Sequence, residues 1–173
     1  MKRSIKIIGS LMSALLVLAL VVLFIAIPIR AENNLLSPLI QKGDRMIVNQ
    51  LAPRLNMIHH EDVIVYRKGG ELHFGRVIGE PGESLAIKGN QFFVDNQPVK
   101  DDWIDQKGVQ NWSSKMLSGQ ESDIISPSDY VVMNQLSPSG GPETFGTVHK
   151  NDIIGTILLR YYPFEKITVN FKD

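Results

Sequence analysis

Cysteine is absent from the 173-residue chain, and so is any excess of charge, since 18 Lys and Arg balance 18 Asp and Glu. Without cysteine, disulfides, thiolate catalysis and Cys-based zinc sites are excluded. Without a basic surplus, the chain offers no electrostatic footprint for a phosphate backbone, so nucleic acid is not an expected partner. No motif predicts a cofactor either.

Charge is also missing from Ile7 to Ile29. As a helix, such a run would extend roughly 34 Å, enough to cross the apolar part of a bilayer. Lys2, Arg3 and Lys6 precede it, which predicts a cytoplasmic N-terminus. A cleaved signal peptide is the alternative, but the run is long for one and Ala26-Ile27-Pro28 is a poor cleavage site.

The sequence thus predicts a single-pass protein of the cell membrane with one extracytoplasmic domain. Its predicted parts are a cytoplasmic N-terminus at 1–6, a transmembrane anchor at 7–29 and a β domain at 30–173. Within that domain, residues 101–128 are rich in Ser, Asp, Gln and Lys and are expected to form a peripheral loop or small lobe.

Beyond residue 29 no stretch has the period of a long helix, and short apolar runs alternate with turn residues. The expected fold class is therefore mainly β, a bent antiparallel sheet or open barrel with one N-terminal transmembrane helix. Pro38 lacks an amide donor, which suits an edge strand. The expected strands are 35–40 at an edge, 45–50, 63–66, 72–78, 84–88, 91–94, 97–99, 130–133 and 153–162.

Four ordered blocks carry a family resemblance. They are Pro38 followed by Gly43-Asp44, then Glu61 to Val65, then Arg76 to Glu83, and finally Phe145-Gly146 with Ile154-Gly155 behind it. In these blocks the chain resembles the type I signal peptidases, in their small Gram-positive form. These are membrane-anchored serine proteases, and the resemblance covers nearly the whole chain and implies their bent β fold.

The resemblance also implies a serine nucleophile with a lysine general base, and this sequence has neither. Set on Pro38, the nucleophile position is Leu35, which has no group that could attack a carbonyl. The lysine position is Gly75, which supplies no base. The family's last block orients the base, and its final positions fall here on Gly141, Pro142 and Glu143. We therefore expect no catalytic residue and a signal-peptidase-like pseudo-enzyme.

Family members bind substrate as an extended strand, and main-chain hydrogen bonds of that kind do not require Ser or Lys. Leu35, Leu36 and Phe74 would keep such a groove apolar, and Gly75 would open space in it. The expected peptide-binding groove is lined by Asn33, Leu35, Leu36, Ser37, Leu72, His73, Phe74 and Gly75.

Proteins of this kind without the dyad assist pilus polymerisation in Gram-positive bacteria. The resemblance therefore implies an accessory or chaperone role, with pilin subunits and a pilus sortase as partners. Residue chemistry alone predicts a membrane-tethered peptide-binding module.

Two other functions stay open. One is a working signal peptidase with a rearranged dyad, in which Ser37 would act with Lys42 or His73. Ser37 is two residues from the family position, a displacement of about 6.6 Å on an extended strand, which is more than a catalytic hydrogen bond absorbs. The other is a structural scaffold that binds a sortase laterally through the membrane helix.

Three further features have structural interpretations. His59-His60-Glu61 lacks the i, i+4 spacing of a helical zinc pair, so a solvated loop and no metal site are expected. Asp44 is expected to brace a turn. Trp103 and Trp112 are expected to pin a loop to the core.

Overall fold

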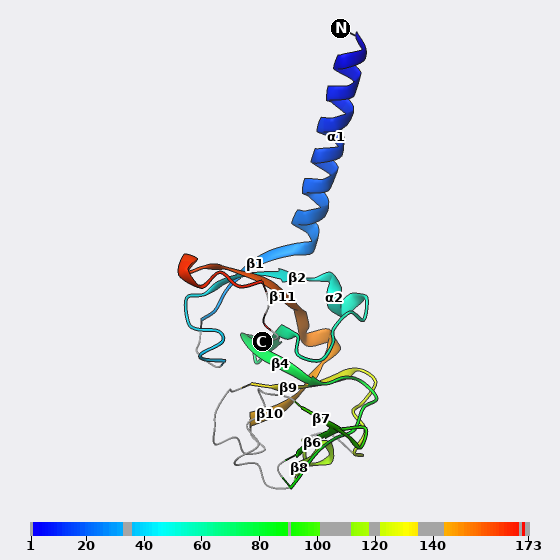
Figure 1. The fold of residues 1–173 in the computed structure, drawn as a ribbon, viewed down its shortest axis with the longest axis vertical. Helices are drawn as coiled ribbons and strands as arrows, with labels where there is room; N and C mark the ends of the chain where they lie inside the picture. Colours follow the sequence, from blue (N-terminus) through cyan, green and yellow to red (C-terminus); the bar gives the residue numbers. More distant parts are fainter. Residues whose placement is uncertain are drawn as a thin grey trace.

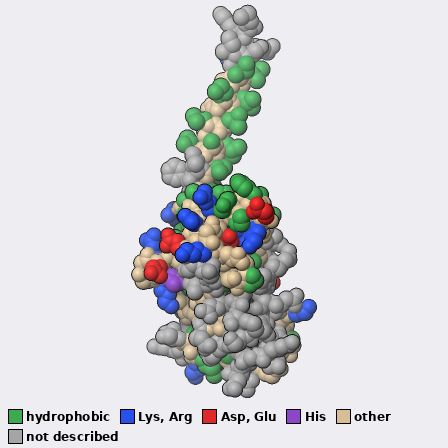
Figure 2. Space-filling model, turned by 90° about the vertical axis from the view of Figure 1, so that its left-hand side faces the viewer, with side chains coloured by type: hydrophobic (Ala, Val, Ile, Leu, Met, Phe, Trp, Pro, Cys, Tyr) green, Lys and Arg blue, Asp and Glu red, His purple; other side chains and the backbone are tan. Residues whose placement is uncertain are grey.

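A computed structural model describes residues 2–32, 36–89, 91–100, 112–117, 122–134, 144–169 and 171. The N-terminal helix α1 (Lys2–Ile25) projects from a β domain, with its N-terminus at the far end (Figure 1). Its described side chains from Lys6 to Leu20 are exposed, and hydrophobic ones line it in Figure 2. Among the described residues, no helix combines the length and the apolar character that crossing a membrane requires.

The chain leaves the helical conformation before the predicted anchor would end. Residues Ala26–Arg30 form strand β1, which pairs antiparallel with β2 (Arg45–Asn49). The prediction of a helical segment as far as Ile29 is therefore wrong in its last turn. Pro28 explains the change, since proline breaks a helix interior but is accepted in an edge strand.

The described residues of the domain form two antiparallel sheets, so the mainly β prediction is confirmed. The larger sheet has the strand order β1-β2-β11-β3-β4-β9-β10. Its remaining strands are β3 (Val63–Lys68), β4 (Glu71–Gly79), β9 (Asp129–Met133), β10 (Phe145–His149) and β11 (Ile153–Tyr162). Its order ends at β1 and β10, so among the described strands the sheet is open and not a closed barrel.

The smaller sheet has the order β7-β6-β5-β8 and lies at the end of the domain away from α1 (Figure 1). Its strands are β5 (Leu85–Lys88), β6 (Gln91–Val94), β7 (Gln97–Val99) and β8 (Trp112–Ser113). Short helices complete the described elements: α2 (Leu51–Arg54), η1 (Ser114–Met116), η3 (Lys150–Asp152) and η4 (Phe164–Lys166).

In the part of the chain that the structure describes, buried side chains form three apolar clusters along the two sheets. Alternation explains the inward set on β2, because Met46 and Val48 are both buried on one face. Trp112 is 2% exposed and its ring lies 4.7 Å from that of Phe145, which confirms that it pins its segment to the core. Trp103, with the rest of 101–111, lies outside the described residues.

The predicted edge strand at 35–40 is wrong where the structure describes it. Residues 36–39 form a turn, and the Ile40 N–H donates to the Leu36 carbonyl over 2.9 Å. Pro38 has no amide donor for a ladder, so a turn accommodates it as readily as an edge. Among the described strands, the edge of the larger sheet next to β2 is β1 instead.

Candidate functional site: a degenerate centre on strand β4

Strand β4 carries the position at which the family resemblance expects a lysine. It pairs with β3 from Glu71 to Arg76, and β9 lies on its other side only from Arg76 to Gly79. Between His73 and Gly75, β3 is therefore the only described strand that pairs with β4. The lysine position thus lies at the point where a second neighbouring strand ends.

The space above Gly75 is filled. A Cβ atom placed on Gly75 would lie 3.0 Å from Val132 Cβ, 3.1 Å from Val132 Cγ2 and 3.2 Å from Asn134 Oδ1. These separations are tighter than ordinary van der Waals contact. The expectation that Gly75 opens space is therefore wrong, because side chains from β9 and from the residue after it occupy that space.

Asn134 is held at this place by two hydrogen bonds. Its main-chain N–H donates to the Thr144 carbonyl over 2.9 Å, and its Oδ1 accepts from the Tyr66 hydroxyl over 2.8 Å. Its Nδ2 would lie 3.0 Å from a Cβ on Gly146, so the carboxamide sits between two glycine positions. Asn134 closes the site from the side of β9, and the sequence alone gave no reason to select it.

Tyr66 supports the carboxamide from β3. Burial raises the pKa of Tyr66 from its ordinary value of 10.0 to about 12. The hydroxyl therefore keeps its proton at neutral pH and can donate to Asn134. The ring also stacks on His73, with centroids 5.6 Å apart. His73 thus packs against a neighbouring strand.

The other predicted groove residues divide into two sets. Leu36 and Phe74 are each 1% exposed and belong to one buried cluster, with Leu72 packed against it. The structure therefore brings the turn after Leu35 next to β4, but these side chains are core residues and do not wall an apolar groove. Asn33 and Leu35 lie outside the described residues, as do Gly141, Pro142 and Glu143.

Ser37 has no described partner for catalysis. Its side chain is exposed and makes no hydrogen bond to any described residue, His73 and Lys42 included. A nucleophile needs a base within hydrogen-bond reach. The described part of the chain therefore contains no assembled nucleophile and base at this centre.

Asp44 braces the turn, as predicted. Its Oδ2 accepts from the Gln41 N–H and from Arg160 Nη1, each over 3.1 Å. Arg160, on β11, also donates from Nη1 to the Leu39 carbonyl over 2.7 Å. The buried ion pair thus ties residues 39–44 to β11, an interior strand of the larger sheet.

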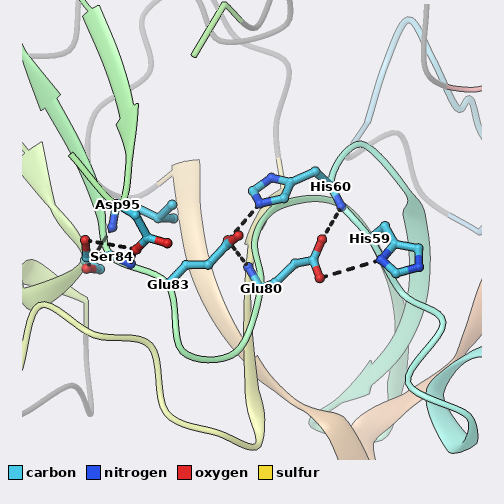
Figure 3. A network of polar contacts seen from close by, with 8 residues as sticks. His59, His60, Glu80, Glu83, Ser84 and Asp95 are labelled. Atoms are coloured by element: carbon cyan, nitrogen blue, oxygen red, sulfur yellow. Dashed lines mark hydrogen bonds and ion pairs between the residues drawn. The ribbon is translucent and has the colours of Figure 1, made fainter. Parts of the chain in front are cut away.

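His59 and His60 join a loop to the turn after β4 (Figure 3). His60 Nε2 lies 2.7 Å from Glu83 Oε2, and the His60 main-chain N–H donates to Glu80 Oε1 over 2.9 Å. His59 Nδ1 lies 3.6 Å from Glu80 Oε2. Among the described residues no group of three or more His, Asp or Glu side chains is placed to hold a metal ion. The network therefore holds the loop that carries His59 and His60 against the turn that follows β4.

The described residues form a mainly β domain that follows an N-terminal helix, and Val132 and Asn134 fill the space at Gly75, the position at which the family resemblance expects a lysine. The family model for signal peptidase, peptidase S26, matches residues 4–162. The chain belongs to the signal peptidase S26 family. This confirms the family predicted from the four sequence blocks.

Two individual relatives differ in what their names say of activity. The chain is 36% identical over 174 residues to "Inactive signal peptidase IA" of Staphylococcus aureus (strain COL), with all of both chains covered. It is 28% identical over 171 residues to "Signal peptidase I U" of Bacillus subtilis (strain 168), covering 94% of this chain and 91% of the relative. The prediction of a family member that leans away from catalysis agrees with the first name.

Among solved structures, a signal peptidase I from Enterococcus faecalis V583 is similar with a TM-score of 0.48 and 20% identity. The match covers 57% of this chain and 95% of that one.

Proposed function

We propose that this protein is a catalytically inactive signal-peptidase-like protein that holds an extended segment of an exported protein at the membrane. The observation that carries the proposal is the filled space above Gly75, where Val132 and Asn134 stand in the place of a general base. The names of the relatives at 36% identity support the loss of activity. The family frame around β4 supports the retained peptide site.

The peptide is proposed to lie along β4, beside His73, Phe74 and Gly75. On the side away from β3, no described strand pairs with these residues. An added strand can form main-chain hydrogen bonds at such an edge, which is how extended peptides are recognised by sheets. The mode of binding therefore depends on the backbone and not on a nucleophile.

We propose in addition that α1 tethers the domain to the cell membrane, with the N-terminus in the cytoplasm. The exposed apolar side chains of α1 support this, as do Lys2, Arg3 and Lys6 at its start. Protease protection in sealed vesicles tests the orientation, since the β domain should be digested from the extracytoplasmic side only.

A paired assay tests the central proposal. Purified full-length protein in detergent micelles is incubated with a signal-peptide substrate, with an active signal peptidase as the positive control. We expect no cleavage product. A product that disappears in Ser37→Ala would instead establish the rearranged dyad. Binding is measured in parallel by the anisotropy of a fluorescein-labelled peptide that carries an Ala-x-Ala cleavage motif, and saturable binding is expected.

Pilin subunits and a pilus sortase are the partners that the family resemblance suggests. If they are the partners, deletion of the gene abolishes pilus polymers and leaves general secretion unchanged. Unchanged polymers would refute this narrower role and leave the peptide-binding proposal standing. A lateral scaffold would differ from both, because its sortase contact would survive removal of the β domain.

A further inference from the structure

We infer that a pocket between α2 and η3 binds the phosphate group of an anionic lipid at the membrane surface. The pocket has a volume of about 550 Å³, which is within the range of small-molecule sites. It shares no lining residue with the centre on β4. Its placement at the membrane rests on the tether proposed above, whereas its ligand chemistry follows from its own side chains.

Two cationic side chains line the pocket, Arg54 at the end of α2 and Lys150 at the start of η3. Among the described residues, neither makes an ion pair, and the lining includes no Asp or Glu. Asp152 belongs to η3 but does not line the pocket. The pocket therefore carries two uncompensated positive charges, which attract an anion.

The donors of the pocket outnumber the acceptors of a carboxylate and suit a phosphate. Lys150 Nζ donates to Asn56 Oδ1, which positions the ammonium group and leaves two of its three donors for a ligand. The guanidinium of Arg54 can bind two phosphate oxygens at once. The carboxamides of Gln50 and Asn151 add neutral donors to the same lining.

The pocket lies where α1 joins the β domain. The main-chain N–H of Gln50, a lining residue, donates to the carbonyl of Ile25, the last residue of α1, over 3.0 Å. Figure 1 shows α2 at the end of the domain from which α1 projects. With α1 in the bilayer, the pocket therefore faces the lipid headgroups.

Exposed apolar side chains beside the pocket favour a lipid over a free phosphate. Leu55 and Met57 flank Asn56 in the chain and are 58% and 53% exposed. Phe164 in η4 is 72% exposed, and η4, red in Figure 1, lies at the same end of the domain. Cations and apolar side chains on one face match the headgroups and acyl chains of a lipid surface.

The experiment measures lipid binding to full-length protein in micelles of a neutral maltoside detergent by native mass spectrometry. Phosphatidylglycerol is the probe, and diacylglycerol is the matched lipid without a phosphate. Arg54→Gln should raise the dissociation constant for phosphatidylglycerol by about tenfold, the loss of one charge-assisted interaction. Adding Lys150→Gln should raise it to about a hundredfold.

Arg67→Gln combined with Lys68→Gln is the matched control, because it removes two charges at exposed positions at the end of β3. This control should bind the lipid like the wild type. Glycerol phosphate and a glutamate-rich peptide are tested as competitors, and neither should displace the lipid at equal concentration.

Each other result overturns the inference in a defined way. Failure to bind phosphatidylglycerol, or equal losses in the pocket variant and the control, would refute the phosphate site. Glycerol phosphate bound as tightly as the lipid would make a free phosphate ester the ligand, and displacement by the acidic peptide would make it a protein carboxylate.

The tests of the proposed function are made on the same protein and fail separately. If the β domain shows the expected protease protection and the labelled peptide binds, absence of lipid binding defeats only the phosphate pocket. If the lipid binds and the protection pattern is wrong, the tether fails and the pocket stands.

Discussion

Arg160 Nη1 donates to Asp44 Oδ2 over 3.1 Å, and this buried pair ties the turn that follows the family's nucleophile position to β11, an interior strand of the larger sheet. The same nitrogen reaches the Leu39 carbonyl, and Arg160 Nη2 donates to Thr168 Oγ1 over 2.9 Å. Arg160 therefore holds the segment from Leu39 to Asp44 and the C-terminal residue Thr168 against β11.

Asp44→Ala should destabilise the domain by about 3 to 5 kcal/mol, because it leaves the buried Arg160 guanidinium without its countercharge. Chemical unfolding of the full-length protein in detergent measures this loss. Asp44→Asn, which keeps an acceptor, should cost less. A free energy of unfolding within error of the wild type for Asp44→Ala would show that the pair contributes nothing.

Gly75→Ala should destabilise the domain by about 1 to 3 kcal/mol, since the new methyl group is forced against Val132 and Asn134. Adding Asn134→Gly removes one of the two obstacles. The double variant should therefore lose less stability than the sum of the single changes, as measured by denaturant unfolding of all four proteins. Strict additivity would contradict the crowding at Gly75.

Tyr66→Phe should cost about 0.5 to 1.5 kcal/mol at neutral pH, because Asn134 Oδ1 loses its donor. The pH dependence gives a second signature. The folded-state pKa of about 12 exceeds the ordinary value of 10.0, so the folded state retains the Tyr66 proton after an unfolded chain has lost it. This contribution to stability is present below pH 10 and is lost as the pH rises toward 12.

Unfolding curves between pH 9 and 12 test this signature. The wild type should lose more stability over this range than Tyr66→Phe does. Burial, with Glu80 as the smaller cause, also raises the pKa of Tyr130, but that residue is common to both proteins. Parallel curves would rule out the assigned role of Tyr66.

Glu83→Ala should destabilise the domain by about 1 to 3 kcal/mol, because Glu83 Oε2 serves both the His60 ring and the Glu80 main-chain N–H, each over 2.7 Å. Figure 3 shows how this one oxygen joins loop and turn. Glu71→Ala, at an exposed position that begins β4, is the control and should be nearly neutral. Equal melting temperatures for the two variants would contradict the stabilising role of Glu83.

Local patterns were sufficient to predict most strands. The apolar run Val63 to Tyr66 and the hydrophobic segment 153–162 indicated β3 and β11, because the residues of each segment themselves favour a buried strand. In the described residues 36–40 the predicted strand was wrong, because Pro38 is compatible with both an edge strand and a turn. The turn that forms has a hydrogen bond between Ile40 and Leu36, and it buries both side chains in the core.

From the sequence, the candidate site could be predicted only as two positions that lack the family's serine and lysine. The family blocks located Leu35 and Gly75, but nothing local indicates what fills the space of a missing side chain. Tyr66 and Asn134 are 68 residues apart in the chain, and their hydrogen bond depends on the order β3-β4-β9 in the larger sheet. A single sequence contains no direct signal for such a contact.

The packing of Asn134 and Val132 over Gly75 makes the loss of catalysis hard to reverse in evolution. A lysine at residue 75 would meet both side chains, so that substitution alone would cost stability and, with leucine at residue 35, gain no activity. Leu35→Ser alone would supply a nucleophile without a base. Neither single substitution therefore gains activity, and the crowding at Gly75 makes a lysine at that position costly to restore.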